Sequence, residues 1–135
     1  MQLLFDNLFG KKQIDTKPIF SIRTELHPYS LKANKSDFVD LEVLLANHSP
    51  EELLTSLVVV VPKQLGFERS IIQHEREMRL GYVAAGEQKR LKVQLWASER
   101  SDRGEYPVRL FAISHYKDYG HVLNEARKQI SIRVE

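Results

Sequence analysis

The sequence predicts an all-β protein, an antiparallel β-sandwich of about seven strands preceded by a short helix. Beyond Ile19, apolar and polar residues alternate with a period of two in short runs. Turn residues separate these runs, and no long helical repeat lies between them. This pattern is typical of packed antiparallel sheets rather than of alternating helices and strands.

Seven runs show the pattern, and they cover residues 20–26, 39–45, 53–61, 71–80, 91–97, 106–113 and 130–134. The third run is continuously apolar up to Pro62, so we expect it to be a central strand. The fourth run is charged and less regular and stops before Gly81, which favours a place at a sheet edge.

A Gly-x-Tyr motif, Gly104-Glu105-Tyr106, opens the sixth run and resembles the tyrosine corner of immunoglobulin-like sandwiches. Asn47 ends the second run, Pro62 ends the third, and Ala85-Gly86-Glu87 precedes the fifth. Over residues 19–135 this order resembles CARDB-type and related seven-stranded immunoglobulin-like domains. The resemblance implies an immunoglobulin-like β-sandwich and a role in binding proteins or glycans, because such domains usually do this on larger proteins.

The phase of the sixth strand follows from its tyrosine. If Tyr106 points into the core, then Phe111 and Ile113 point outward, on a sheet that the third and seventh strands share. An apolar patch on an outer face marks an interface. Three candidates could cover this patch: the chain's own N-terminal segment, a second copy in a homodimer, or another protein.

Composition excludes several classes of protein. With 135 residues, 42% hydrophobic and 28% charged, the chain fits one globular domain. The absence of cysteine excludes disulfides, thiolate metal sites and a cysteine nucleophile. The net charge of +2 comes from interleaved charges, which argues against a dedicated nucleic-acid binder. Without an export signal or a membrane-spanning stretch, we expect a cytoplasmic protein.

Residues 1–17 differ from the rest and predict an amphipathic helix and linker, followed by the sandwich over 18–135. Leu4, Phe5, Leu8 and Phe9 fall at helical spacing, and Gly10 with Lys11-Lys12 suits a helix end. Three interpretations stay open. The helix packs on its own domain, or it lies at a membrane surface and resembles the targeting segments of cytoskeletal adaptors such as SepF. As a third option, Gln2 to Phe9 resembles the sliding-clamp interaction box, from which Phe5 and Leu8 depart.

The loop between the last two strands is the main candidate for contact, since immunoglobulin-like domains bind through such loops. His115, Tyr116, Tyr119 and His121 are amphipathic side chains that suit recognition. His115, Asp118 and His121 offer zinc ligands in principle, but their spacing matches no established site. Gly81 to Gly86 lacks the lysine of a phosphate loop, and no catalytic motif is present.

The sequence therefore predicts a non-enzymatic protein-interaction module without a metal or cofactor. If its N-terminal helix serves as an anchor, the protein is peripheral at a membrane or forms a dimer. The predicted contact residues are Leu4, Phe5, Leu8, Phe9, Phe111, Ile113, His115, Tyr116, Tyr119 and His121. The alternative is a glycan- or nucleic-acid-binding domain in which Trp96 stacks on the ligand beside Arg90 and Lys92, with Tyr116 and Tyr119 as further stacking platforms and Lys117 nearby.

Overall fold

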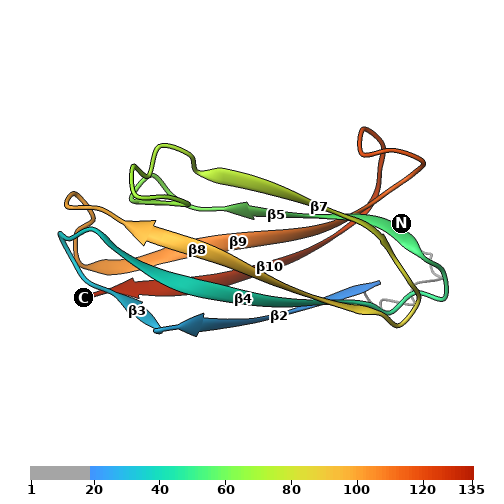
Figure 1. Cartoon of the computed structure of the whole chain (residues 1–135), viewed down its shortest axis with the longest axis horizontal. Coiled ribbons are helices and arrows are strands. Elements are labelled where there is room, and N and C mark those ends of the chain that lie inside the picture. The colour runs from blue at the N-terminus through green and yellow to red at the C-terminus, as the bar shows by residue number, and fades with distance from the viewer. Residues whose placement is uncertain (1–18) are drawn as a thin grey trace, which may run out of the picture.

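A computed structural model describes residues 19–135, which form nine strands in two sheets and no helix (Figure 1). The strands are β2 (Phe20–His27), β3 (Ser30–Leu31), β4 (Asp37–Asn47), β5 (Leu53–Val60), β6 (Leu65–Gly66), β7 (Glu75–Val83), β8 (Gln88–Ala97), β9 (Gly104–His115) and β10 (Val122–Val134). Within this range no helix is long and apolar enough to cross a membrane. The predicted helix over 1–17 lies outside the described residues.

The two sheets pack as a β-sandwich. The five-stranded sheet has the order β3-β10-β9-β5-β7, and the four-stranded sheet has the order β2-β4-β8-β6. All pairs are antiparallel except β3 with β10. The immunoglobulin-like, all-β prediction is confirmed, and the seven predicted strands are the seven long ones. The two-residue strands β3 and β6 were missed because so short a segment has no periodicity to detect.

Two strand boundaries differ from the prediction. β7 begins at Glu75 and not at Ile71, whose φ of 45° belongs to a turn. It also continues through Gly81 to Val83, because Leu80 forms a bulge opposite Thr55 and Ser56 and Gly81 beside it takes a positive φ of 75°. β10 begins at Val122, well before the predicted Ile130, since its first half pairs with β9 through mostly polar residues that show no alternation. The edge position of β7 is confirmed.

The core lies between the sheets and is built by the alternating residues of the long strands. Its largest fully buried side chains include Phe20, Leu41, Leu45, Leu57, Leu95, Leu110 and Ile132. Burying each such side chain stabilises the fold by about 1.5–3 kcal/mol. The alternation that identified the strands therefore also identified the core.

The phase of β9 agrees with the prediction from Tyr106. Val108, Leu110 and Ala112 are fully buried in the core, while Phe111 and Ile113 point to the opposite face and are half-buried. The hydroxyl of Tyr106 donates a hydrogen bond of 2.7 Å to the carbonyl of Asp102. This bond back to the preceding turn is the tyrosine corner.

Asn47 joins the ends of three segments. Its side-chain Nδ2 donates to the carbonyls of Val83 at 2.9 Å, Ala84 at 3.2 Å and Glu51 at 2.9 Å, and its Oδ1 accepts from Ser49 N at 2.8 Å. The side chain is fully buried. The asparagine that ends the second strand thus holds the β4–β5 turn against the β7–β8 turn.

Candidate interaction surface

The outer face of the five-stranded sheet carries an apolar strip at its centre. On β9, Phe111 lies directly opposite Val58 of β5, and Arg109 lies opposite Val60. We define the strip as Val58, Val60, Phe111 and Ile113, all of which are half-buried. The strip is continuous across the two central strands, because paired residues of neighbouring strands share a face.

Charged side chains flank the strip on both sides. On β7, Glu75, Glu77 and Arg79 lie opposite the outward residues of β5. On β10, Arg127 lies opposite Phe111, with its guanidinium 5.6 Å from the ring centroid. An apolar centre with a charged rim is the usual anatomy of a protein-protein interface.

The loop between β9 and β10 folds over one end of this face. The Tyr119 hydroxyl accepts a hydrogen bond from the backbone N–H of Gly81 at 2.9 Å. Its ring lies 4.7 Å from the Arg79 guanidinium and 5.0 Å, edge on, from the His115 ring. Tyr119 is therefore half-buried and attaches the loop to the edge strand β7.

His115 is not available to a partner, so its prediction as a contact residue is wrong. β9 extends as far as His115, which is only 6% exposed beneath the loop. Its Nε2 forms a hydrogen bond of 2.7 Å with the fully buried Ser56 hydroxyl. The sequence places Ser56 on an apolar strand and His115 in the loop after the sixth strand, and it does not show that they face each other.

Tyr116 and His121 remain exposed on the loop. Asp118 organises the loop by accepting hydrogen bonds at 2.8 Å from Gly120 N and at 2.8 Å from His121 Nδ1. The bond to His121, followed by that from Gly120, lowers the pKa of the Asp118 carboxyl. Of the four predicted loop contacts, Tyr116 and His121 are exposed to solvent. Tyr119 is half-buried where it binds β7, and His115 is buried beneath the loop.

Two clusters that the sequence did not reveal lie elsewhere. On the outer face of the four-stranded sheet, donor atoms of Glu25, His27 and Glu42 lie within 4.8 Å of one another. The Arg90 guanidinium lies 3.8 Å from the Glu42 carboxylate, so a cation already neutralises part of this exposed group. These residues come from two strands, and only the pairing of β2 with β4 brings them together.

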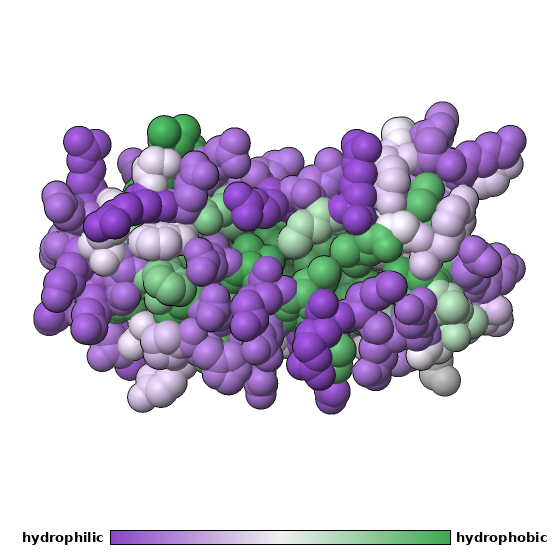
Figure 2. Space-filling model, viewed as in Figure 1, coloured by the Kyte–Doolittle hydropathy of each residue, from purple (hydrophilic) through white to green (hydrophobic). Residues whose placement is uncertain are grey.

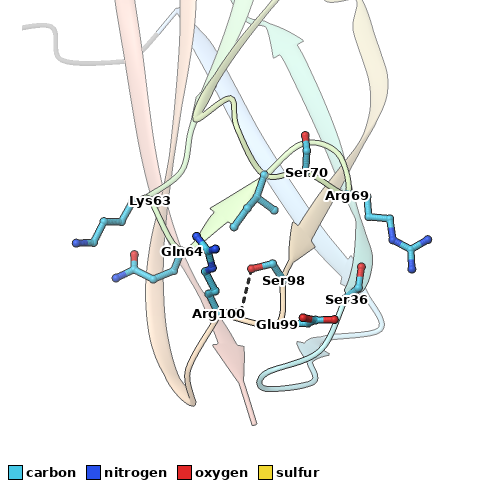
Figure 3. A pocket seen from close by; sticks show the side chains of 9 residues that line it. Ser36, Lys63, Gln64, Arg69, Ser70, Ser98, Glu99 and Arg100 are labelled. Carbon is cyan, nitrogen blue, oxygen red and sulfur yellow. Dashed lines mark hydrogen bonds between the residues drawn. The ribbon is translucent and has the colours of Figure 1, made fainter.

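The second cluster lines a cavity of about 710 Å³ at the end of the sandwich near β6 (Figure 3). Its lining combines three serines and three cations with one carboxylate and consists of Ser36, Lys63, Gln64, Arg69, Ser70, Ile71, Ser98, Glu99 and Arg100. Figure 3 shows the Lys63 and Arg69 side chains pointing away from the centre of this group. The lining offers hydrogen-bond donors, and one of its hydroxyls, that of Ser70, donates to the Glu68 carboxylate at 3.3 Å.

The residues of the alternative ligand site share one face of β8. Arg90 and Lys92 are exposed there, whereas Trp96 is half-buried and stacks on Phe38 with ring centroids 4.8 Å apart. Tyr116 and Tyr119 lie on the loop of the other sheet, so they do not join Trp96 in one aromatic platform. The predicted contacts Leu4, Phe5, Leu8 and Phe9 lie outside the described residues.

No protein-family model matches this sequence, and no curated protein matches it either. Among solved structures, the chain is similar to the alkylpurine DNA glycosylase AlkC of Pseudomonas fluorescens, at a TM-score of 0.49 and 12% identity over 82% of this chain. It spans 30% of that enzyme's chain. It is also similar to an ASH/PapD-like domain of human CEP192, at a TM-score of 0.46 and 17% identity over 93% of both chains.

A conjugative transposon lipoprotein from Bacteroides eggerthii has a TM-score of 0.45 and 9% identity over 86% of this chain and 98% of its own. Similarities this weak carry no information on function. The resemblance to CARDB-type domains accordingly extends to the β-sandwich and no further.

Proposed function

We propose that this chain is a non-enzymatic protein-interaction module whose contact surface is the apolar strip, with Tyr116 and His121 at one end. The observation that carries the proposal is the half-buried pair Phe111 and Ile113 in the second half of β9, between Arg109 and His115 on the same face. Leaving such side chains at the centre of a sheet face lowers solubility, and a partner surface removes them from water.

The opposite face of the sandwich supports this assignment by contrast. At the centre of the four-stranded sheet the outward residues Asp40, Glu42, Arg90 and Lys92 are charged, and Arg90 forms an ion pair with Glu42. The apolar pair of this face, Phe38 and Trp96, lies toward one end of β4 and β8. Within residues 19–135, the outer face with apolar side chains at its centre is therefore that of the sheet that contains β5 and β9.

The test places a photo-crosslinking residue at position 113 of the full-length chain in its native cell, with a matched variant at Gln94 on the other sheet. We expect a discrete covalent adduct with a protein from position 113 and none from position 94. Excess wild-type protein should suppress the adduct, whereas excess Ile113→Lys should not. Equal crosslinking from both faces, or equal suppression by both competitors, would contradict the proposal.

We further propose that the N-terminal segment attaches this module to a membrane surface or to a second copy. Support comes from the sequence, in which Leu4, Phe5, Leu8 and Phe9 share one side at helical spacing and two lysines follow. A full-length variant with serine at all four positions is compared with wild type. Sedimentation velocity reports dimers, and flotation with vesicles containing anionic lipid reports membrane binding. This proposal is wrong if the serine variant and wild type give the same result in both assays.

The alternative function is binding of a glycan or nucleic acid by Trp96, Arg90 and Lys92. Its supporting observation is that the three side chains share one outward face of β8. Retention on heparin or on a single-stranded oligonucleotide, weakened by salt and by Trp96→Ala, is the result that this function requires. If Trp96→Ala is retained on these polyanions as strongly as wild type, the binding comes from charge alone and Trp96 does not contact the ligand.

A further inference from the structure

On the side of the sandwich formed by β7 and β8, the last long strand of each sheet lacks a full neighbour. β7 forms the edge of the five-stranded sheet, and β8 is covered only by β6, which pairs with Trp96 and Ala97. Among residues 19–135, the segment 88–95 of β8 therefore has no strand partner on that side. Its free backbone groups point along the open side of the sandwich.

Half-buried apolar side chains lie between the two edges. We call this group the seam and define it as Leu53, Met78, Leu80 and Leu91, which pack against the core without being fully covered. Met78 lies opposite the fully buried Leu57, so it faces inward. Figure 2 shows hydrophobic side chains gathered in a band across the middle of the face, between the positions of β7 and β8 in Figure 1.

On the other side of the sandwich, β2 is also an edge strand and β10 is paired with β3 only at Arg133 and Val134, but a side chain links the two sheets. There the Lys128 ammonium, on the inward side of β10, donates a hydrogen bond of 3.1 Å to the carbonyl of Ile22 on β2. This contact joins the two sheets and satisfies a backbone group of the edge strand β2. Within residues 19–135, no side chain links β7 to β8 by a hydrogen bond or an ion pair.

Of the two open edges, β8 is the better template for another strand. The register of β7 is interrupted by a bulge, and its outward residues Glu75, Glu77 and Arg79 are all charged, which protects an edge from pairing. β8 pairs with β4 without any register shift from Gln88 to Ala97. A regular edge beside an uncovered apolar surface is the arrangement that strand addition uses.

The charges of β8 indicate which strand fits. Lys89, Arg90 and Lys92 are all cationic, and no acidic residue lies between Gln88 and Ala97. Lys89 forms an ion pair with Glu87 at 3.2 Å, and Glu42 of β4 lies opposite Lys92 and 3.8 Å from Arg90, so this one carboxylate serves two cations. Two copies of β8 side by side would bring like charges together, which disfavours pairing between copies of this chain. Carboxylates on an added strand would lie beside Arg90 and Lys92, and its alternate residues would cover Leu91 and the seam.

We propose that the β8 edge binds an extended segment of a partner protein in which apolar and acidic residues alternate. The segment adds a strand beside residues 88–95, a length of about 26 Å. Its backbone bonds to the free groups of β8, its apolar side chains cover the seam, and its carboxylates face Arg90 and Lys92. This site lies apart from the apolar strip, so either proposal can fail without the other.

Three capped nine-residue peptides serve as probes of the ¹⁵N-labelled full-length chain. One alternates valine with glutamate, one alternates valine with lysine, and one is the glutamate peptide with alternate backbone nitrogens methylated. We expect saturable NMR shifts and slowed amide exchange over 88–95 with the first peptide. The lysine peptide should bind at least about tenfold more weakly, because two charge contacts change sign. Methylation should abolish binding, since it removes the backbone donors.

A variant pair tests the charge contacts. In Arg90→Gln/Lys92→Gln, we expect the glutamate and lysine peptides to bind with affinities within about twofold of each other. The matched control, Arg109→Gln/Arg127→Gln, removes two cations from the other outer face and should leave the preference intact. Any of four results would overturn the proposal. The wild-type protein binds the glutamate and lysine peptides equally, it binds the methylated peptide, its NMR shifts are confined to β7 or to the apolar strip, or it binds no peptide at millimolar concentration. Concentration-dependent protection of 88–95 without peptide would assign the edge to a second copy and would also overturn it.

Discussion

The Nε2 atom of His115 lies 2.7 Å from the Oγ atom of Ser56, and both side chains are buried beneath the β9–β10 loop. We expect Ser56→Ala and His115→Ala each to destabilise the protein by about 1–3 kcal/mol, because each leaves a buried polar partner unpaired. The double variant should lose less than the sum, with a coupling of about 0.5–1.5 kcal/mol in urea unfolding. Strict additivity would show that the bond contributes nothing.

Asn47 should be among the most sensitive polar positions. Asn47→Ala removes the donor to three carbonyls and the acceptor of Ser49 N, all at one fully buried side chain. We expect a loss of about 2–4 kcal/mol in the free energy of unfolding. The control, Asn124→Ala, changes an exposed residue of β10 and should stay within about 0.5 kcal/mol of wild type. Similar losses for the two variants would contradict this role.

The tyrosine corner can be tested by removing one oxygen. Tyr106→Phe keeps the ring and loses the hydrogen bond to the Asp102 carbonyl. We expect a destabilisation of about 0.5–1.5 kcal/mol, measured by thermal or urea unfolding. Tyr29→Phe, at a residue that is 79% exposed, provides the control and should be neutral. A neutral Tyr106→Phe would mean that the turn before β9 is held by other contacts.

The β9–β10 loop should respond to acid. Because its hydrogen bonds lower the pKa of Asp118, the carboxylate favours the folded loop above the pKa of the unfolded chain, near 3.9, and this contribution is lost as the pH falls through the lower folded value. A carboxyl NMR titration should therefore give a midpoint below about 3.9. His121→Ala removes the largest cause and should raise the midpoint. A midpoint that does not move would show that His121 is not responsible.

Much of the fold could be predicted because burial imposes alternation on each strand separately. The phase of β9 followed from Tyr106 alone, and the apolar character of β5 showed that it is central. The first half of β10 could not be recognised, since it is exposed and pairs with β9 through polar residues. His115 was misassigned for a related reason: its burial depends on Ser56, 59 residues away in the chain.

By itself the sequence determined the sandwich, the inward and outward sides of its long strands, and the outward position of Phe111 and Ile113. These properties follow from periodicities within single strands, where neighbouring residues share the same local geometry. Only the tertiary structure decided that His115 is enclosed with Ser56, that Tyr119 attaches its loop to β7, and that β8 has an open edge beside the seam. Such features depend on which strands become neighbours, and contacts between distant segments leave no periodic trace in one sequence.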